Sequence, residues 1–535
     1  MEELKVMLLN RRPKVLLIYP GSKSAGAVYP TGLLYIALSL RKINIDVSIF
    51  HMGIDDISSI RLENYLFVGI SMLTGDLIKN GLYLAKIIRN YNNHIPIVIG
   101  GVHPSLLPEE SLQNELVDFV VIGEGDKTIQ ELATCLLNNS DISGIKGLGY
   151  KDSNKKVIIN AQREFLDMNE LDFDLPYELL SFFSKKTSVI VHTSRGCPYR
   201  CSFCYNPVVN KRKYRCKSAE RVIDEIEHLH KKYRIDYFSF ASEDEFFIYP
   251  QRVYEILKFI LQRDIKIRWT AFCRFNTFIQ AYDKFGQDFI DTIKKSGCLY
   301  LSFGAESGSQ RLLDDIIHKD IKIEQITRTI EILKNANIPH RVSFICCFPT
   351  ETQTDLNATF DVIDKITLNN PLITLGLFKL IPFPGTGIYD LLKKEYNLKT
   401  PSSLEEWGNY NLSGNAPLDD ISWLPEKHVK MCHNLTLIAK YPFHKDVKSF
   451  KEYKEFISSI DSSHWPGYID YIMVKIQKWR YVNKKFDLMI EFPIHELFVK
   501  FRVFLGRYLL FKYLPKSVYD KLVKRFWRKN KFPPV

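Results

Sequence analysis

The chain has 535 residues, of which 46% are hydrophobic and 25% are charged, and it holds 10 cysteines. This composition excludes a disordered chain, a collagen-like chain and a small disulfide-stapled protein, and it provides for more than one hydrophobic core. Lysine and arginine (73) exceed aspartate and glutamate (61), which gives a mild formal charge of +12. We find no secretory signal pattern and no apolar run of about 18 residues, so we expect a cytoplasmic protein without a membrane-spanning helix.

Residues 1–140 alternate short apolar runs with helical periods. The predicted strands are Val15–Tyr19, Val47–Phe50, Phe67–Ser71, Ile97–Ile99 and Phe119–Ile122, and the predicted helices are Gly32–Arg41, Lys79–Tyr91 and Lys127–Leu137. This alternation is typical of an α/β fold with a parallel sheet buried on both faces. We therefore predict a Rossmann-like doubly wound domain, with a ligand beyond the carboxyl ends of its strands. The polar segment 141–186 is interpreted as a connector.

The alternation resumes over residues 187–395. The predicted strands here are Val189–Thr193, Tyr237–Ala241, Ile267–Phe272, Tyr300–Gly304, Arg341–Cys346 and Thr374–Leu380, with helices between them. Repeated βα units of this length predict a partial or complete β/α barrel.

A cysteine motif of the form C-x3-C-x2-C follows the first barrel strand, with thiols at Cys197, Cys201 and Cys204. Closely spaced thiolates on a loop are typical ligands of a [4Fe–4S] cluster, and three of them leave one iron open. A structural zinc site is the alternative, but it normally needs four protein ligands. The adjacent Cys346 and Cys347 are interpreted as buried packing, without an assigned chemistry.

The remaining residues, 396–535, are predicted to form a mostly helical extension. Its end is basic and aromatic, and Ile494, Leu497, Phe498 and Phe501 fall on one face of an amphipathic helix. Such a tail could pack on the barrel with a solvated basic side, or lie on an anionic membrane surface. Nucleic-acid binding ranks last, because no RNA-binding module accompanies the tail.

The three-cysteine motif, at the end of a first barrel strand, resembles the hallmark of the radical S-adenosylmethionine (radical SAM) superfamily. Further strand-end motifs agree with the family in order, including the segment 303–309 and the P-x-P-G-T of 382–386. The resemblance implies a β/α barrel, a [4Fe–4S] cluster on the three cysteines, and S-adenosylmethionine (SAM) bound to the open iron. The SAM contacts that it implies are Tyr205, Glu243, Arg274, Gly304, Glu306 and Ser307.

A Rossmann-like domain before such a barrel is similar to the cobalamin-binding subfamily. Glycine-rich turns after successive strands carry this likeness, notably Gly100-Gly101 and Gly123-Glu124-Gly125. The cobalamin contacts that it implies are Ser71, Thr74, Gly100, Gly101, His103, Gly123, Glu124 and Gly125. The D-x-H-x-x-G motif is absent, so the sequence does not indicate a lower axial histidine. The alternative is a degenerate domain that docks on the barrel and binds nothing.

The resemblance implies a cobalamin-dependent radical SAM methyltransferase that acts on an unactivated carbon of a small molecule. It also implies an external donor that supplies electrons to the cluster. A hydrophobic or lipid-like substrate and peripheral membrane contact are hypotheses that rest on the basic tail alone. The alternative is a cobalamin-binding oxidoreductase or cyclase without methyl transfer. A non-enzymatic iron–sulfur or zinc protein, tethered by its tail, is the rival from another class.

Overall fold

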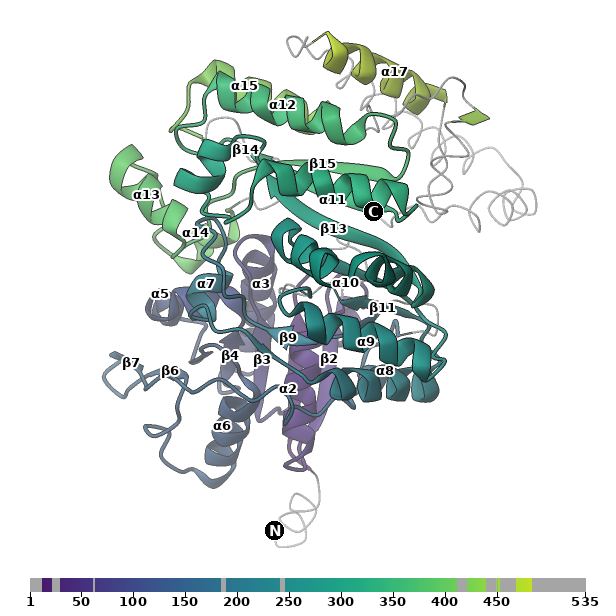
Figure 1. The fold of residues 1–535 in the computed structure, drawn as a ribbon. Helices are drawn as coiled ribbons and strands as arrows, with labels where there is room; N and C mark the ends of the chain where they lie inside the picture. Colours follow the sequence, from purple (N-terminus) through teal and green to yellow (C-terminus); the bar gives the residue numbers. More distant parts are fainter. Residues whose placement is uncertain are drawn as a thin grey trace, which may run out of the picture.

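The chain folds into two α/β units followed by helices of a C-terminal extension (Figure 1). The computed structural model describes residues 12–21, 29–60, 63–183, 189–240, 246–410, 421–438, 449, 451–452 and 468–483. Among these residues, no helix is long and apolar enough to cross a membrane.

The N-terminal unit is built on a seven-stranded sheet of order β2-β1-β3-β4-β5-β6-β7. Its strands are β1 (Lys14–Tyr19), β2 (Asp46–His51), β3 (Phe67–Ser71), β4 (Ile97–Gly100), β5 (Phe119–Val121), β6 (Leu148–Lys151) and β7 (Val157–Ile159). Its helices are α2 (Thr31–Arg41), α3 (Asp76–Tyr91), α4 (Val102–Leu106), α5 (Pro108–Gln113) and α6 (Asp126–Asn138), with a short 3-10 turn η2 (Ile57–Ser59). The first five strands are parallel, in the order of a doubly wound fold, as predicted.

Both faces of this sheet are buried, and β1 shows why its sequence is apolar throughout. Val15 and Leu17 belong to the core formed with α2 and α6, whereas Leu16 and Ile18 belong to the core formed with α3. Successive side chains of a strand point to opposite faces, so a strand between two helical layers needs apolar residues at every position. The carboxyl ends of the parallel strands are therefore left as the edge where a ligand can enter.

The segment predicted as a connector contributes two strands to this sheet. β6 pairs with β5, and β7 pairs with β6, both in the antiparallel sense. The prediction missed them because the strands are only four and three residues long and lie within a segment that is otherwise rich in polar residues. The rest of the segment is irregular apart from the 3-10 turn η3 (Tyr177–Leu179).

The second unit is a six-stranded parallel sheet of order β15-β14-β13-β12-β11-β8. Its strands are β8 (Val189–Ile190), β11 (Tyr237–Phe240), β12 (Arg268–Cys273), β13 (Cys298–Glu306), β14 (His340–Cys346) and β15 (Ile373–Lys379). Its helices are α8 (Ala219–Tyr233), α9 (Pro250–Gln262), α10 (Phe275–Lys295), α11 (Ile323–Asn335), α12 (Gln353–Thr367) and α13 (Gly387–Tyr396), with a π-helical turn η4 (Leu312–Ile316).

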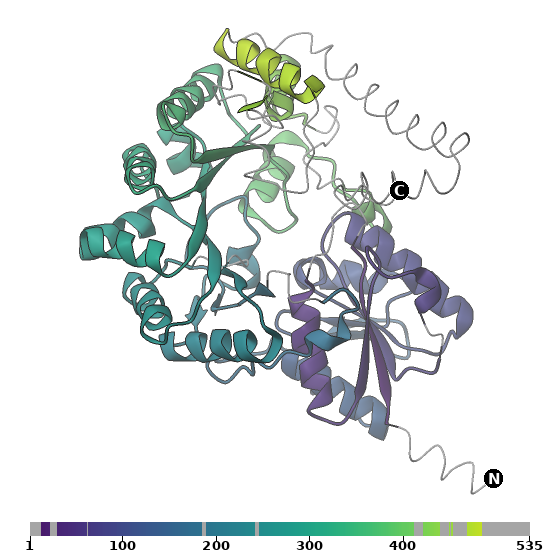
Figure 2. The ribbon, with the colours of Figure 1, turned by 90° about the vertical axis from the view of Figure 1, so that its right-hand side faces the viewer.

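This second sheet is a partial barrel, because β8 and β15 are its two edges. The helices lie outside the curved sheet, and the N-terminal unit lies across from its inner side (Figure 2). The first strand is shorter than predicted. After β8 the chain runs into β9 (Ser194–Arg195), which pairs antiparallel with β10 (Arg215–Cys216) instead of extending the barrel.

The extension is helical where the structure describes it, with α14 (Leu404–Gly408), α15 (Glu426–Ile438) and α17 (Tyr468–Val482). Trp407 of α14 is fully buried in the core that contains α3, so the extension reaches back to the N-terminal unit. Tyr481 of α17 packs at 5.9 Å from the ring of Phe360 on α12. The amphipathic tail over 494–509 and the basic residues after it lie outside the described residues.

Candidate functional site

The three cysteines of the motif lie on the loop between β9 and α7 (Asn206–Val209). Backbone hydrogen bonds fix this loop at its centre: the Ser202 amide donates to the carbonyl of Ile317 (2.9 Å), and the Ile388 amide donates to the carbonyl of Ser202 (2.9 Å). The loop is thereby held between the segment that follows β13 and the start of α13. Its thiols sit on irregular backbone at the carboxyl end of the barrel sheet.

The thiol environment fits a cluster better than a single ion. Cys201 is buried, and Cys197 and Cys204 are half-buried. Burial, followed by the nearby thiols of Cys201 and Cys197, raises the pKa of Cys204 to about 12. Elsewhere among the described residues, two groups of ligand atoms lie within 4.8 Å of one another, which is close enough for a single ion. The thiols of Cys197, Cys201 and Cys204 do not form such a group. A cubane of four irons spaces its thiolate ligands more widely.

Arg274 reaches the cysteine loop from the end of β12. Its Nη1 donates to Cys201 Sγ at 3.3 Å, and its guanidinium lies 3.6 Å from the ring centroid of Tyr199. The side chain is buried, and its Nη2 also donates to the carbonyl of Lys319. The buried guanidinium therefore holds the cysteine loop against the end of β12.

An ion pair lies at the carboxyl end of β13. Lys319 Nζ and Glu306 Oε1 are 2.7 Å apart, and the two side chains are 7% and 8% exposed. Glu306 has a φ of 64°, and a Cβ at Gly304 would lie only 2.1 Å from Glu306 Oε1. Gly304 therefore leaves the space that the turned carboxylate occupies. Lys319 Nζ is also 6.0 Å from the ring of Phe203, so the pair borders the cysteine loop.

The remaining residues predicted for SAM are placed differently. Ser307 is fully buried, with its hydroxyl 3.4 Å from that of Thr359 and accepting from the Ser309 amide at 3.0 Å. Its hydroxyl is therefore engaged in packing against α12. Tyr205 precedes α7 and lies 5.7 Å, edge to face, from the ring of Phe383. Glu243 lies outside the described residues.

A cavity of about 290 Å³ lies between the two units. The N-terminal unit lines it with strand ends and glycine-rich turns, including Ser71, Gly100, Gly101, Gly123, Glu124 and Gly125. The barrel unit lines it with His192, Arg195, Gly196, Val209 and Asn210. A Cβ at Gly32 or Gly123 would meet no atom within 4 Å, so these glycines keep the cavity open. Six of the eight residues predicted for cobalamin are thus brought to one cavity.

Thr74 and His103 are not among the residues that line this cavity. They bind each other instead, with Thr74 Oγ1 2.9 Å from His103 Nδ1. The His103 ring packs edge to face against Trp407 at 5.4 Å. Burial lowers the pKa of His103 to about 4, so this imidazole is neutral near pH 7.

Glu124 joins the two units electrostatically. Its carboxylate is 2.7 Å from Arg215 Nη2 and 3.4 Å from Arg195 Nη1, and Arg195 also lies 3.3 Å from Asp126. Burial alone would raise the pKa of Glu124, but the hydrogen bond from Arg215 and the charge of Arg195 bring it below its usual value. The pairing fixes the barrel's β9 and β10 against the turn after β5.

Comparison with known proteins agrees with this geometry. Residues 191–363 match the radical SAM superfamily model, and residues 20–133 match the B12 binding domain model. An uncharacterized methyltransferase of Pyrococcus horikoshii is 31% identical over 395 residues, which cover 70% of this chain and 82% of that protein. The chain belongs to the radical SAM superfamily. Within it, this radical SAM enzyme has the B12-binding domain that the sequence resemblance implied.

Two further comparisons extend this picture. The anaerobic magnesium-protoporphyrin IX monomethyl ester cyclase of Rubrivivax gelatinosus is 26% identical and covers 65% of each chain. The structure of the cobalamin-dependent SAM radical enzyme OxsB matches with a TM-score of 0.67 at 18% identity, over 94% of this chain and 76% of that one. The second match shows that both units and their order belong to a known architecture.

Two residues of this radical SAM enzyme were missed by sequence reasoning. Lys319 follows η4 at a position with no motif, so only the fold reveals it as the partner of Glu306. His192 lines the cavity, and burial, with the charges of Arg195 and Lys217, lowers its pKa to about 3. Its place just before the cysteine loop was the available signal, but it fell within a predicted strand.

Proposed function

We propose that this radical SAM enzyme transfers a methyl group to an unactivated carbon of a small-molecule substrate, with cobalamin as the methyl carrier. One observation carries the proposal: Gly196 lines the cavity between the two units, and the next residue is Cys197. A group held by the glycine-rich turns of the B12-binding domain would therefore border the loop of the cluster cysteines. This adjacency suits a reaction that uses both cofactors on one substrate.

The cysteine loop fits the cluster and SAM. Cys197, Cys201 and Cys204 would hold three irons and leave the fourth to the amino and carboxylate groups of SAM. The Arg274 guanidinium would hold the Cys201 side chain in place, and its burial would limit access of water to the cluster. The residues proposed to contact SAM are Tyr205, Glu243, Arg274, Gly304, Glu306 and Ser307. When bound, the cluster and SAM supply a 5′-deoxyadenosyl radical, and cobalamin supplies the methyl group.

The cavity would hold only a part of cobalamin, since its volume is far below that of a whole corrinoid. The open space at Gly32 and Gly123 would admit the nucleotide tail between backbone segments. Ser71 and the neutral His192 would offer hydrogen bonds on opposite walls. Thr74 and His103 would act indirectly, by supporting the turn after β4. Gly100, Gly101, Glu124 and Gly125 complete the proposed wall.

The decisive measurement is made without oxygen. Protein reconstituted with iron, sulfide and hydroxocobalamin is given SAM and a reductant, and 5′-deoxyadenosine and S-adenosylhomocysteine are quantified by mass spectrometry. We expect both products, and we expect S-adenosylhomocysteine to disappear when cobalamin is omitted. If protein with a full cluster forms neither of the two products, the result contradicts the proposal.

Two cysteine variants test the cluster assignment. Cys201→Ala should abolish SAM cleavage, because it removes one of three iron ligands. Cys216→Ala is the matched control, since Cys216 lies nearby on β10 and takes no part in the loop. It should retain both cleavage and iron content. Cleavage by Cys201→Ala at the rate of the control would show that the cluster is held elsewhere.

The similarity to the Rubrivivax gelatinosus cyclase favours a second candidate, a cobalamin-bound radical reaction without methyl transfer. The same assay separates the two candidates. If 5′-deoxyadenosine forms and substrate is consumed but no S-adenosylhomocysteine appears, the result would favour the cyclase-like reaction. The non-enzymatic interpretation is not supported, because the chain matches the radical SAM family at its catalytic domain.

The basic tail supports a further part of the proposal, namely peripheral membrane contact and a hydrophobic or lipid-like substrate. Its charge and aromatic content suit an anionic bilayer surface. We expect the full chain to sediment with anionic vesicles more than a chain ending at Asn483, and the difference should shrink at high salt. Equal sedimentation of the two chains would contradict it. Reduction of the cluster would need an external one-electron donor.

A further inference from the structure

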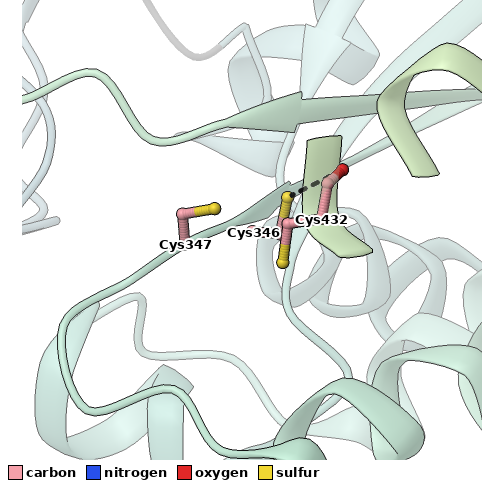
Figure 3. A group of neighbouring side chains, drawn as sticks. All are labelled: Cys346, Cys347 and Cys432. Atoms are coloured by element: carbon pink, nitrogen blue, oxygen red, sulfur yellow. Dashed lines mark hydrogen bonds between the residues drawn. The ribbon is translucent and has the colours of Figure 1, made fainter. Parts of the chain in front are cut away.

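Three thiols converge at a place that the cysteine loop does not use. Cys346 ends β14 and Cys347 follows it, while Cys432 lies on α15 of the extension. Their sulfur atoms all lie within 4.8 Å of one another. Figure 3 shows the side chains of the strand end beside the helix, with Cys346 Sγ 3.9 Å from the Cys432 carbonyl. The same thiol lies 3.3 Å from the carbonyl of Phe378, which is its nearer acceptor. The sequence had favoured simple packing for the adjacent pair.

A carboxylate and an imidazole complete this cluster of side chains. Glu351 Oε2 accepts from the Cys347 amide at 2.7 Å, and it lies 3.0 Å from His428 Nε2 and 3.8 Å from Cys432 Sγ. Ligand atoms of Glu351, His428 and Cys432 form a second set within 4.8 Å. His428 and Cys432 are four residues apart, so they lie on one face of α15.

The chemistry of these groups is unusual for packing. The Glu351 and His428 side chains are 2% and 9% exposed, and Cys347 and Cys432 are fully buried. A buried carboxylate is costly unless hydrogen bonds or a cation compensate it, and here the Cys347 amide and the His428 imidazole approach it beside the thiols. Cys347 also has a φ of 67°, in the left-handed region, and the Trp423 indole donates to its carbonyl at 2.9 Å. A non-glycine residue held in that conformation is typical of functional sites.

We propose that Cys346, Cys347 and Cys432 bind a zinc ion, with the fourth ligand supplied by Glu351 or His428. Zinc prefers thiolate, imidazole and carboxylate ligands in a tetrahedron, and metal–sulfur bonds of about 2.3 Å place thiolates about 3.8 Å apart. The three sulfur atoms lie within 4.8 Å of one another, so small shifts bring them to that separation. A closed site with four protein ligands is structural, not catalytic. This ion would join the carboxyl end of the barrel sheet to α15, so it would hold the extension over that edge of the active site. The site is independent of the proposed methyl transfer.

Metal analysis of the full chain tests this proposal. Protein from zinc-supplemented, anaerobic growth should contain one zinc per chain in addition to the iron of the cluster. Cys347→Ser and Cys432→Ser should each reduce zinc to background and leave iron unchanged. Cys135→Ser, at a half-buried thiol of α6, is the control and should keep both metals. If Cys347→Ser and Cys432→Ser lower the iron content together with the zinc content, the assignment is wrong.

Cobalt substitution keeps the test valid if a cysteine variant fails to fold. The unaltered chain, exchanged with Co²⁺, should show thiolate-to-cobalt charge transfer and the visible bands of tetrahedral cobalt. His428→Ala and Glu351→Gln identify the fourth ligand, because only the ligand's loss should change the visible bands strongly. An unaltered chain that takes up neither zinc nor cobalt at this site, or that holds two of the three cysteines as a disulfide under reducing conditions, would disprove the proposal.

Discussion

At the end of β13, the buried charges of Glu306 and Lys319 stabilise each other. Both side chains are almost fully buried, so each is the chief compensation for the other. Removing one partner of such a pair costs about 3–5 kcal/mol, while replacing both by neutral groups is much less costly.

We therefore expect Lys319→Met to lower the Tm clearly and the double variant Lys319→Met/Glu306→Gln to recover most of the loss. Lys322→Met is the control, since its partner Asp314 and its own side chain are largely exposed, and exposed pairs contribute about 0–1 kcal/mol. Thermal denaturation, monitored by circular dichroism, measures the Tm of each of the three variants. A double variant no more stable than Lys319→Met would show that the pair is not coupled.

At the scale of elements, α14 connects the extension to the N-terminal unit. Trp407 is fully buried against α3 and the ring of His103, and its carbonyl accepts from the Gly75 amide at 3.1 Å. Trp407→Ala should cost about 3–5 kcal/mol, because a large buried side chain leaves a cavity. Trp479→Ala on α17 is the control, since that ring is 58% exposed. Limited proteolysis should cut the first variant faster than the second. Equal resistance of the two variants to the protease would show that α14 does not stabilise the N-terminal unit.

How far the sequence predicts the fold depends on the element. Buried parallel strands such as β1 were predicted well, because burial on both faces leaves a continuous apolar run. The antiparallel strands β6 and β7 were not, because strands of four and three residues are too short to show a clear apolar run.

The same reasoning applies to the site. The cysteine loop is local in sequence, so its spacing revealed it. Cys346 and Cys432 are separated by 86 positions, and Glu351 and His428 by 77, so only the fold brings them together. His103 shows a related limit: its turn follows a strand end, but its Nδ1 lies 2.9 Å from Thr74 Oγ1 and it is not among the residues that line the cavity.

At the scale of the whole molecule, the contact of Glu124 with Arg215 and Arg195 makes domain docking sensitive to pH. The pKa of Glu124 is lower than its usual value of 4.5 in the folded chain. Its charge therefore stabilises the folded state above the unfolded pKa, and this contribution is lost as the pH falls through the folded pKa.

Glu124→Gln should lower the Tm near pH 7, by an amount corresponding to about 1–3 kcal/mol for a charged hydrogen bond. The gap in Tm between this variant and the unaltered chain should narrow as the pH falls below about 4.5 and through the lower folded pKa of Glu124, because protonation removes the same charge. Glu164→Gln is the control, since its pair with Lys146 is exposed. A gap that stays constant with pH would show that the charge of Glu124 does not hold the two units together.

The N-terminal unit is completed by pieces from elsewhere in the chain. Its sheet ends in β6 and β7, its turn after β5 is paired with β9 and β10, and its α3 core contains Trp407. An exchange of B12-binding domains between relatives, cut where the family model ends at residue 133, would thus sever contacts on three sides. A working chimera has to carry residues 12–166 together with the matching β9, β10 and α14, so this domain cannot be exchanged as a separate module.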